Sequence, residues 1–262
     1  MVKNKVALQL YTVREECQAD FFGTLKKIKA AGYAGVQFAG FYGYEPQEIK
    51  TVLDKLDLKA AGLHVGYAAI KEETAMLVEA AKIVGTKDLI VPSLPKELQN
   101  EDGYRQVKQD LQKIAEQLKS EDIRISYHNH AFEFATEVDH QDALAYLLNP
   151  AGSPDVYAEI DVFWVQKAGH DPLDYIQAYA NRMPIIHLKD MSDDEERYDV
   201  PIGTGVIDFT PILEWGEQSD VEWYVVEQDR CRFDAIESIT LSYKNLSKLI
   251  DQLKNKENVV HE

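Results

Sequence analysis

Strand-like and helix-like segments alternate eight times along this chain. The expected strands cover 6–10, 36–39, 60–65 and 89–91, a segment that begins at Arg124, and 156–162, 185–188 and 224–226. Apolar residues at helical spacing fill the stretches between them, most clearly over 104–118. Eight consecutive strand–helix units without a linker-like break favour a closed barrel over an open sheet. We therefore expect an α/β protein that forms a single (β/α)8 TIM-barrel domain over residues 1–262.

Charge and cysteine content restrict the functions that such a barrel can have. The formal net charge is −17, which repels the phosphate backbone and disfavours nucleic acid as a partner. The two cysteines, Cys17 and Cys231, form no CxxC pair, and no apolar run approaches the ~20 residues needed to cross a bilayer. We expect a cytoplasmic protein with no membrane partner. The sequence leaves the oligomeric state open, a homo-oligomer included.

Imidazole and carboxylate side chains gather at the ends of the last four expected strands. Residues two apart in a strand share one face, and a barrel places its active site at the carboxyl ends of its strands. The pairs are His128 and His130, Glu159 and Asp161, His187 and Lys189, and Glu227 and Asp229.

Burying these groups inside a barrel is costly without a compensating cation or hydrogen bonds. A shared divalent metal is one explanation, and a nitrogen and oxygen donor set suits Mn²⁺ or Zn²⁺, with Co²⁺ or Mg²⁺ as alternatives. Separate local roles are the other explanation: Asp161 can cap a loop, and Glu159 can pair with Lys189. A shared metal explains the polar residues at four neighbouring strand ends better than four separate local roles do.

Two further features near the strand ends allow a functional or a purely structural interpretation. Tyr11 and Trp164 can line a sugar-binding mouth, although aromatic residues near loops are often only packing. The Gly203–Gly205 turn can bring backbone amides to a substrate oxyanion, or it can be a plain tight turn.

Several motifs together resemble the xylose isomerase-like TIM-barrel superfamily of sugar isomerases and epimerases. The resemblance covers nearly the whole chain, and these motifs carry it: Leu8-Gln9-Leu10-Tyr11, Tyr127-His128-Asn129-His130 with Glu133-Phe134, Glu159-Ile160-Asp161, His187-Leu188-Lys189-Asp190, Gly203-x-Gly205 and Glu227-Gln228-Asp229. It implies a divalent metal on strands five to eight. Asp161, His187 and Glu227 match three of the four family ligands.

His128 stands where the resemblance leads us to expect a first metal-binding glutamate. In ketose epimerases of this superfamily the two metal-bound glutamates act as acid and base on opposite faces of the sugar. Here only Glu227 keeps that role. Trp164 likewise replaces a substrate-contacting histidine, and Glu133 lies near the position of a further substrate-contacting glutamate.

The resulting hypothesis is a metal-dependent sugar or sugar-phosphate isomerase or epimerase. His128, Asp161, His187 and Glu227 would bind the metal, which stabilises an enediolate after a proton next to the carbonyl is removed.

The remaining expected roles divide between catalysis and substrate binding. Glu227 or Glu133 would remove the proton, and Lys189 or His130 would steady charge. The expected substrate-binding residues are Tyr11, His64, His130, Glu159 and Trp164.

Three alternatives remain. The first is a dehydratase or lyase of keto-sugars or keto-inositols, which the His128 substitution favours. The second is an AP-endonuclease-like enzyme, and the third is a non-catalytic sugar-binding barrel.

Overall fold

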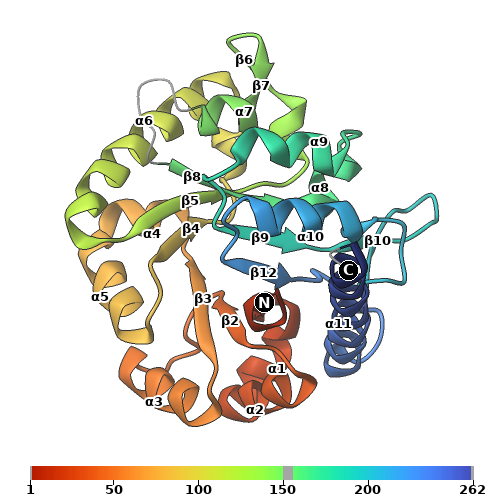
Figure 1. Cartoon of the computed structure of the whole chain (residues 1–262). Coiled ribbons are helices and arrows are strands. Elements are labelled where there is room, and N and C mark those ends of the chain that lie inside the picture. Colours follow the sequence, from red (N-terminus) through yellow and green to blue (C-terminus); the bar gives the residue numbers. More distant parts are fainter. Residues whose placement is uncertain (1, 150–155, 261–262) are drawn as a thin grey trace.

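Eight parallel strands close into a barrel in the computed structural model, which describes residues 2–149 and 156–260 (Figure 1). Their order around the barrel is β1-β12-β9-β8-β5-β4-β3-β2. The strands are β1 (Val6–Gln9), β2 (Gly35–Phe38), β3 (Lys59–His64), β4 (Asp88–Val91), β5 (Arg124–His128), β8 (Val156–Asp161), β9 (Ile185–Leu188) and β12 (Trp223–Val226). The predicted fold class is confirmed. The expected single domain over 1–262 also includes residues 1, 150–155 and 261–262, which lie outside this description.

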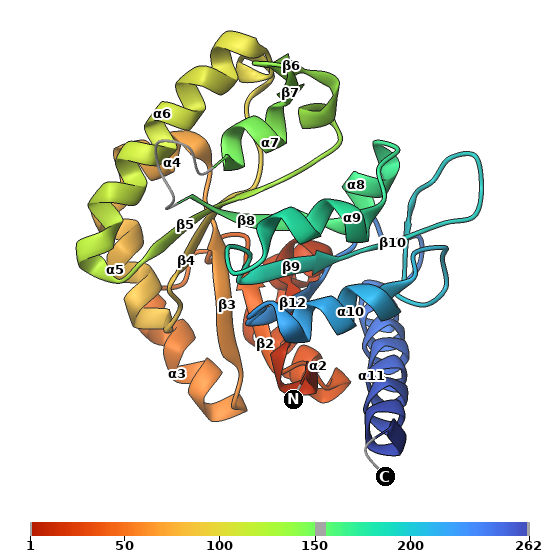
Figure 2. The same cartoon turned by 45° about the horizontal axis from the view of Figure 1, so that its top comes forward.

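Helices cover the outside of the barrel (Figure 2). They are α1 (Arg14–Ala19), α2 (Phe21–Ala31), α3 (Pro46–Leu56), α4 (Tyr67–Glu72), α5 (Thr74–Val84), α6 (Glu101–Leu118), α7 (Ala143–Leu148), α8 (Val162–Lys167), α9 (Pro172–Ile176), α10 (Phe209–Gln218) and α11 (Ala235–Val260). Local sequence signals explain where helices begin, and α9 is an example. The Asp171 carboxylate caps α9 by accepting a hydrogen bond from the Asp174 amide, and Pro172 takes the first helical position.

The barrel interior is built in layers, because alternate residues of each strand point inward. A separate apolar cluster fills one level: Ala7, Ala61, Ile90, Ile185 and Val225. Two residues further along the same strands come Gln9, His187 and Glu227. The chain thus changes from apolar to polar toward the carboxyl ends of the strands, where the site lies.

An ion-pair cluster closes the opposite end of the barrel. The Arg124 guanidinium, at the start of β5, binds both carboxylate oxygens of Asp88 at 2.7 and 2.8 Å. The same guanidinium pairs with Glu222, just before β12. This cluster ties three strands together at the end remote from the polar layer.

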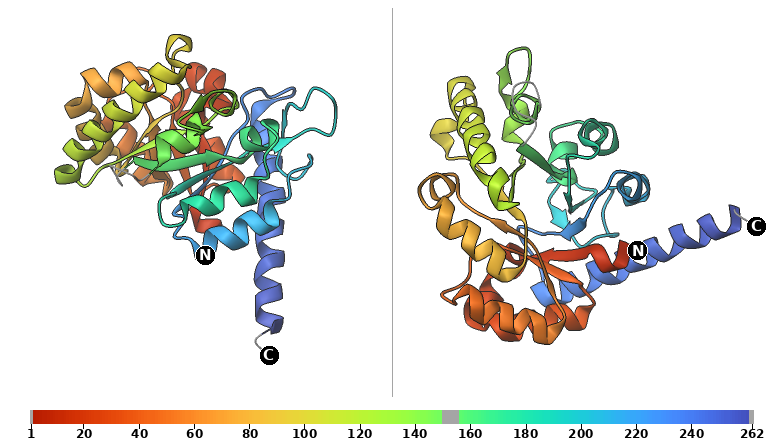
Figure 3. Two further views of the ribbon diagram at one scale, coloured as in Figure 1. Left: turned by 90° about the horizontal axis from the view of Figure 1, so that it is seen from above. Right: turned by 60° about the vertical axis from the view of Figure 1, so that its left-hand side comes forward.

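Two short hairpins and a long helix complete the structure. The hairpins pair β6 (Glu137–Val138) with β7 (Gln141–Asp142), and β10 (Asp190–Met191) with β11 (Asp199–Val200). Helix α11 packs on α2 and projects well beyond the barrel (Figure 3). In the described part of the chain, every helix is too short or too polar to span a bilayer.

Candidate active site

A cavity of about 990 Å³ opens at the carboxyl ends of the strands. Its wall includes most of the residues that the sequence marked for substrate binding or catalysis. Those that line it are Tyr11, His64, His130, Trp164 and Glu227, and the predicted metal ligand His128 lines it as well. Asp161, His187 and Lys189 have no solvent exposure and belong to the buried cluster that Glu227 and His128 border.

The four residues predicted to bind metal lie together. Each of His128, Asp161, His187 and Glu227 offers one donor atom, and these atoms all lie within 4.8 Å of one another. They come from β5, β8, β9 and the residue after β12, which are neighbours around the barrel. The prediction that four strand ends converge on one point therefore agrees with the geometry.

The donor set fits a divalent cation. The Asp161 Oδ1 atom caps helix α8 by accepting from the Phe163 amide at 2.9 Å, whereas Oδ2 is buried and faces the cluster, with the Lys189 ammonium 3.0 Å away. His128 Nε2 lies 3.9 Å from this oxygen, and His187 Nδ1 lies 3.1 Å from Glu227 Oε2. Two imidazoles and two carboxylates facing one point match the ligand types of Zn²⁺ and Mn²⁺ sites.

Lys189 is the internal counter-ion of this cluster. Its ammonium lies 3.0 Å from Asp161 Oδ2, 3.1 Å from Glu227 Oε2 and 3.0 Å from Asp229 Oδ2. Burial lowers the pKa of Lys189, but the carboxylates of Asp161 and Glu227 outweigh it and hold that pKa well above its usual value. Lys189 is therefore a fixed positive charge beside the proposed ligands.

The two carboxylates respond differently to that charge. Burial raises the pKa of Asp161 to about 6, although Lys189 opposes the shift. Burial also acts to raise the pKa of Glu227, but Lys189 and His187 outweigh it and hold the pKa well below its usual value. Glu227 is therefore ionised at neutral pH.

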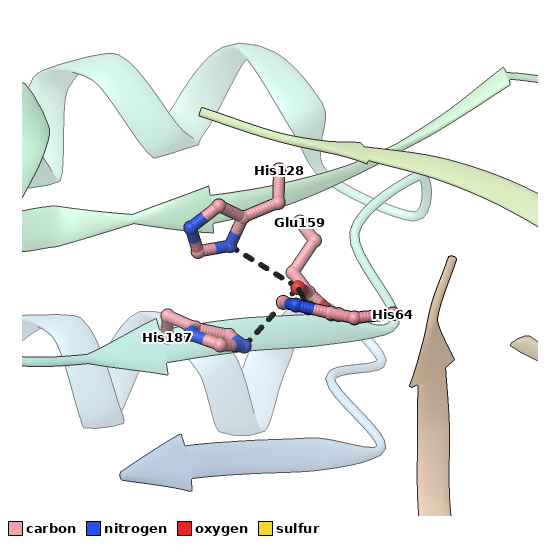
Figure 4. A group of neighbouring side chains, drawn as sticks. All are labelled: His64, His128, Glu159 and His187. Atoms are coloured by element: carbon pink, nitrogen blue, oxygen red, sulfur yellow. Dashed lines mark hydrogen bonds and ion pairs between the residues drawn. The ribbon is translucent and has the colours of Figure 1, made fainter. Parts of the chain in front are cut away.

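A second, deeper group surrounds Glu159 (Figure 4). His64, His128 and His187 all approach Glu159 Oε1, at 2.6, 3.2 and 3.1 Å. The other carboxylate oxygen accepts a hydrogen bond from Gln37 Nε2 at 2.6 Å. Glu159 has no solvent exposure and does not line the cavity, so the structure does not support its predicted contact with substrate.

His130 and Trp164 form one part of the cavity wall. Their rings lie 5.2 Å apart between centroids, and both residues line the cavity. Within the described chain, the buried atoms His130 Nδ1 and Trp164 Nε1 have no hydrogen-bond partner. Burial, assisted by the charge of Lys189, lowers the pKa of His130 to about 4, so its imidazole is neutral. A neutral imidazole and an indole N–H suit the hydroxyl groups of a sugar.

The structure does not bring Glu133 to the cavity, so its predicted role as a base is unsupported. Its carboxylate accepts hydrogen bonds from the Tyr127 hydroxyl and the His130 amide, each at 2.8 Å, and it has no solvent exposure. The physical reason is local. The chain turns into a 3₁₀-helix over Phe132–Ala135, which directs Glu133 behind the strand end and makes it a support for His130.

The sequence allowed two roles for the Gly203–Gly205 turn, and the structure supports the purely structural one. Asp190 Oδ2 accepts from the amides of Gly203 and Gly205, each at 2.9 Å. A Cβ on Gly205 would lie 2.1 Å from the Met191 carbonyl oxygen, so glycine is required there. These amides are occupied by Asp190 and are not directed at a substrate oxyanion.

Sequence reasoning gave no role to Gln9 and Gln37, which belong to the buried layer. Gln9 Nε2 donates to Gln37 Oε1 at 2.7 Å, and both side chains are fully buried. A glutamine inside an apolar strand was the available signal, because a buried amide needs partners.

A family model described as xylose isomerase-like TIM barrel matches residues 25–252. The chain belongs to this family. The expected resemblance is confirmed. Proteins that this chain resembles include inosose dehydratases and sugar phosphate isomerase/epimerases.

Individual relatives are distant but cover most of the chain. An inosose dehydratase of Clostridium beijerinckii is 22% identical over 249 residues, which are 80% of this chain and 82% of the relative. A sugar phosphate isomerase/epimerase from Parabacteroides distasonis has a similar structure, with a TM-score of 0.79, 21% identity and 93% coverage of both chains. The IOLI protein, whose structure holds a zinc atom, gives a TM-score of 0.72 at 15% identity, with 95% of this chain and 99% of that chain covered.

Proposed function

We propose that this protein is a metal-dependent lyase that removes water from a keto-inositol or a related keto-sugar. One observation carries the proposal. Glu227 is the carboxylate that both lines the cavity and touches the imidazole cluster, while the strand-five position holds His128. Burial, assisted by His187, holds the pKa of His128 well below its usual value, so its imidazole is neutral and can ligate a metal. As a metal ligand, His128 has its lone pair engaged and offers no second base. Elimination of water on one face of a substrate needs only one such base.

The proposed metal ligands are His128, Asp161, His187 and Glu227, with Zn²⁺ or Mn²⁺ as the expected ion. Two imidazoles in the set favour these ions over Mg²⁺, which prefers oxygen ligands. When bound, the ion polarises the substrate carbonyl as a Lewis acid and so acidifies the adjacent C–H group.

The protein's own side chains then account for the proton movements. Ionised Glu227 takes the proton from the carbon next to the carbonyl, and the electron pair forms a C=C bond as the β-hydroxyl departs. If the leaving hydroxyl lies on the same face of the substrate as the abstracted proton, protonated Glu227 can donate that proton to the departing oxygen. Water leaves, the product is an enone, and Glu227 is ionised again.

Lys189, His130 and Trp164 support this sequence. The Lys189 ammonium, 3.1 Å from Glu227 Oε2, keeps that carboxylate ionised before the reaction. His130 and Trp164 present unpaired polar atoms to the substrate hydroxyl groups. Tyr11 and His64 complete the wall of the cavity. Two inosose dehydratases that are 22% and 24% identical and cover 80% and 81% of this chain support a keto-inositol as the first substrate to test.

Isomerisation is the second candidate, and the same single carboxylate favours it over epimerisation. One base can move a proton between neighbouring carbons on one face, whereas inverting a centre needs a group on each face. The isomerase thus shares the first proton abstraction with the lyase and differs in where the proton returns.

Incubation with keto-inositols, ketoses and 3-keto-glycosides in D₂O separates the two. We expect loss of water from a keto-inositol, followed as enone absorbance and as a mass decrease of one water. Deuterium at the carbon next to the carbonyl, with no water lost, would establish the isomerase instead. No product and no exchange with the metal-loaded protein would contradict both.

A further inference from the structure

Glu159 is a carboxylate shared by three imidazoles, and neither candidate reaction assigns it a role. It is fully buried below the cavity on β8, with His64, His128 and His187 around Oε1 (Figure 4). Since an ionised carboxylate can only accept hydrogen bonds, each facing ring nitrogen must carry a proton. Glu159 therefore decides which nitrogen of each ring is protonated.

The same carboxylate orients the amide beside it. Gln37 Nε2 donates to Glu159 Oε2 at 2.6 Å, which turns Gln37 Oε1 toward His187 Nε2 at 2.7 Å. Gln9 Nε2 donates to the same Gln37 oxygen at 2.7 Å. His187 Nε2 thus faces two acceptors, so the protonated form of that nitrogen is strongly preferred.

The opposite nitrogens of the two rings face the outer group of carboxylates. His128 presents Nδ1 to Glu159 and Nε2 to Asp161, at 3.2 and 3.9 Å. His187 presents Nε2 to Glu159 and Nδ1 to Glu227, each at 3.1 Å. Without a metal, His187 Nδ1 donates to the ionised Glu227 carboxylate. Metal ligands must be deprotonated, so ligation requires that this outer proton leaves while Glu159 keeps the inner proton. The outer nitrogens are then the ones that can supply lone pairs to the proposed cation.

The inner group also brings four donor atoms within 4.8 Å of one another, but its contact distances favour hydrogen bonds. Ligand atoms around a tetrahedral ion with bonds of about 2.0–2.1 Å lie roughly 3.3 Å apart. His128 and His187 lie 3.2 and 3.1 Å from Glu159 Oε1, but His64 Nε2 lies only 2.6 Å from it, which is a hydrogen-bond distance and too short for two ligands of one ion. We therefore assign hydrogen bonds to the inner group, His64, His128, Glu159 and His187, and the cation to the outer group.

We propose that Glu159 is a positioning residue that holds both metal-binding imidazoles, His128 and His187, in the tautomer and orientation that ligation requires. This inference rests on the proposed function, because it assumes the cation site. A carboxylate that accepts the second N–H of a ligating histidine is a common support in metal sites. Here one carboxylate serves two ligands on two different strands.

The test measures metal binding and its spectrum. Zn²⁺ affinity is determined by competition with a chromophoric chelator, and the absorption spectrum of the Co²⁺-loaded protein reports the ligand geometry. Glu159→Gln keeps the size of the side chain but places an amide N–H₂ against imidazole donors. We expect a 10- to 100-fold weaker Zn²⁺ affinity and an altered Co²⁺ spectrum. Glu159→Asp keeps the charge and should recover part of the affinity.

Asp88→Asn is the matched control. It also removes a buried carboxylate, but at the Arg124 cluster at the other end of the barrel, so Zn²⁺ affinity and the Co²⁺ spectrum should not change. Equal affinity in wild type and Glu159→Gln would overturn the inference, as would an equal loss in Asp88→Asn. If Glu159→Gln does not fold, Glu159→Asp decides: affinity weaker than wild type supports the inference, and unchanged affinity overturns it. Absence of Zn²⁺ binding in the wild type would instead refute the proposed function.

Discussion

Replacing Lys189 by methionine should destabilise the metal-free protein by about 4 kcal/mol. Methionine fills a similar volume but carries no charge, so Asp161, Glu227 and Asp229 lose the ammonium at 3.0–3.1 Å. At about 3 Å and an effective dielectric constant of about 20, each attraction amounts to roughly 5 kcal/mol, most of it offset by the desolvation of the charges. Removing one partner from a buried ionic cluster typically costs about 3–5 kcal/mol.

Urea unfolding in the presence of EDTA measures this cost. The expected loss corresponds to a fall in Tm of roughly 10 °C for a chain of this size. Lys82→Met is the matched control, because Lys82 pairs with Glu121 at 2.6 Å on the surface and should contribute less than about 1 kcal/mol. Excess Zn²⁺ should stabilise Lys189→Met more than it stabilises the wild type, since the ion replaces the missing positive charge.

A loss below about 1 kcal/mol for Lys189→Met would refute the reasoning. It would mean that the three carboxylates are protonated or solvated in the metal-free protein, and that Lys189 is not their counter-ion.

Three further changes test other parts of the structure. Glu227→Gln should lower kcat for enone formation by about 10²–10⁴-fold at saturating metal, and a kcat within threefold of wild type would show that another group takes the proton. Burial raises the pKa of Glu133 to about 7 from 4.5, so the folded state binds the proton more tightly and stability falls as the pH rises between these values. The loss amounts to about 3 kcal/mol above pH 7, and comparison of urea unfolding at pH 5 and pH 8 should show a smaller pH dependence in Glu133→Gln. Asp190→Ala leaves four backbone amides without their acceptor and should lower the unfolding free energy by roughly 3 kcal/mol or more, whereas a loss within 0.5 kcal/mol of zero would show that water replaces the carboxylate.

The barrel was predictable because each strand is a short apolar run bounded by turn or helix signals. Seven predicted strands are found within one residue of both expected ends, and β5 begins at Arg124 as expected, since the apolar interior and the surrounding helices impose the same two periodicities that the sequence shows. The apolar spacing over 72–84 predicts a helix that corresponds to α5 (Thr74–Val84), whereas the short helix α4 (Tyr67–Glu72) before it was not predicted. The two-residue strands of the hairpins are too short to leave a signal.

The convergence of His128, Asp161, His187 and Glu227 was also predictable, because period-two alternation and barrel closure together place them on one side. The depth of each of these side chains along the barrel axis was not predictable. Glu159 and Asp161 share a face, yet one lies beneath the imidazoles and the other among the proposed ligands. Alternation states which face a residue occupies and says nothing about which neighbours reach it.

Hydrogen bonds formed within the folded loops explain the remaining differences. Glu133 was expected at the substrate because it follows the strand end closely, but a 3₁₀ turn directs it to Tyr127 and to the His130 amide. The sequence did not decide the role of the Gly203 and Gly205 amides. Their hydrogen-bond acceptor, Asp190, lies 13 and 15 residues earlier in the chain. Such contacts depend on the folded loop and not on local spacing.

Metal content tests the central claim most directly. The wild type, His187→Ala and the exposed-residue control His140→Ala are loaded with Zn²⁺, desalted and measured by elemental analysis. The account predicts one metal ion per chain in the wild type and in His140→Ala, and loss of that metal in His187→Ala. No metal in the wild type, or equal metal in His187→Ala, would contradict the claim that side chains from four neighbouring strand ends bind one shared cation.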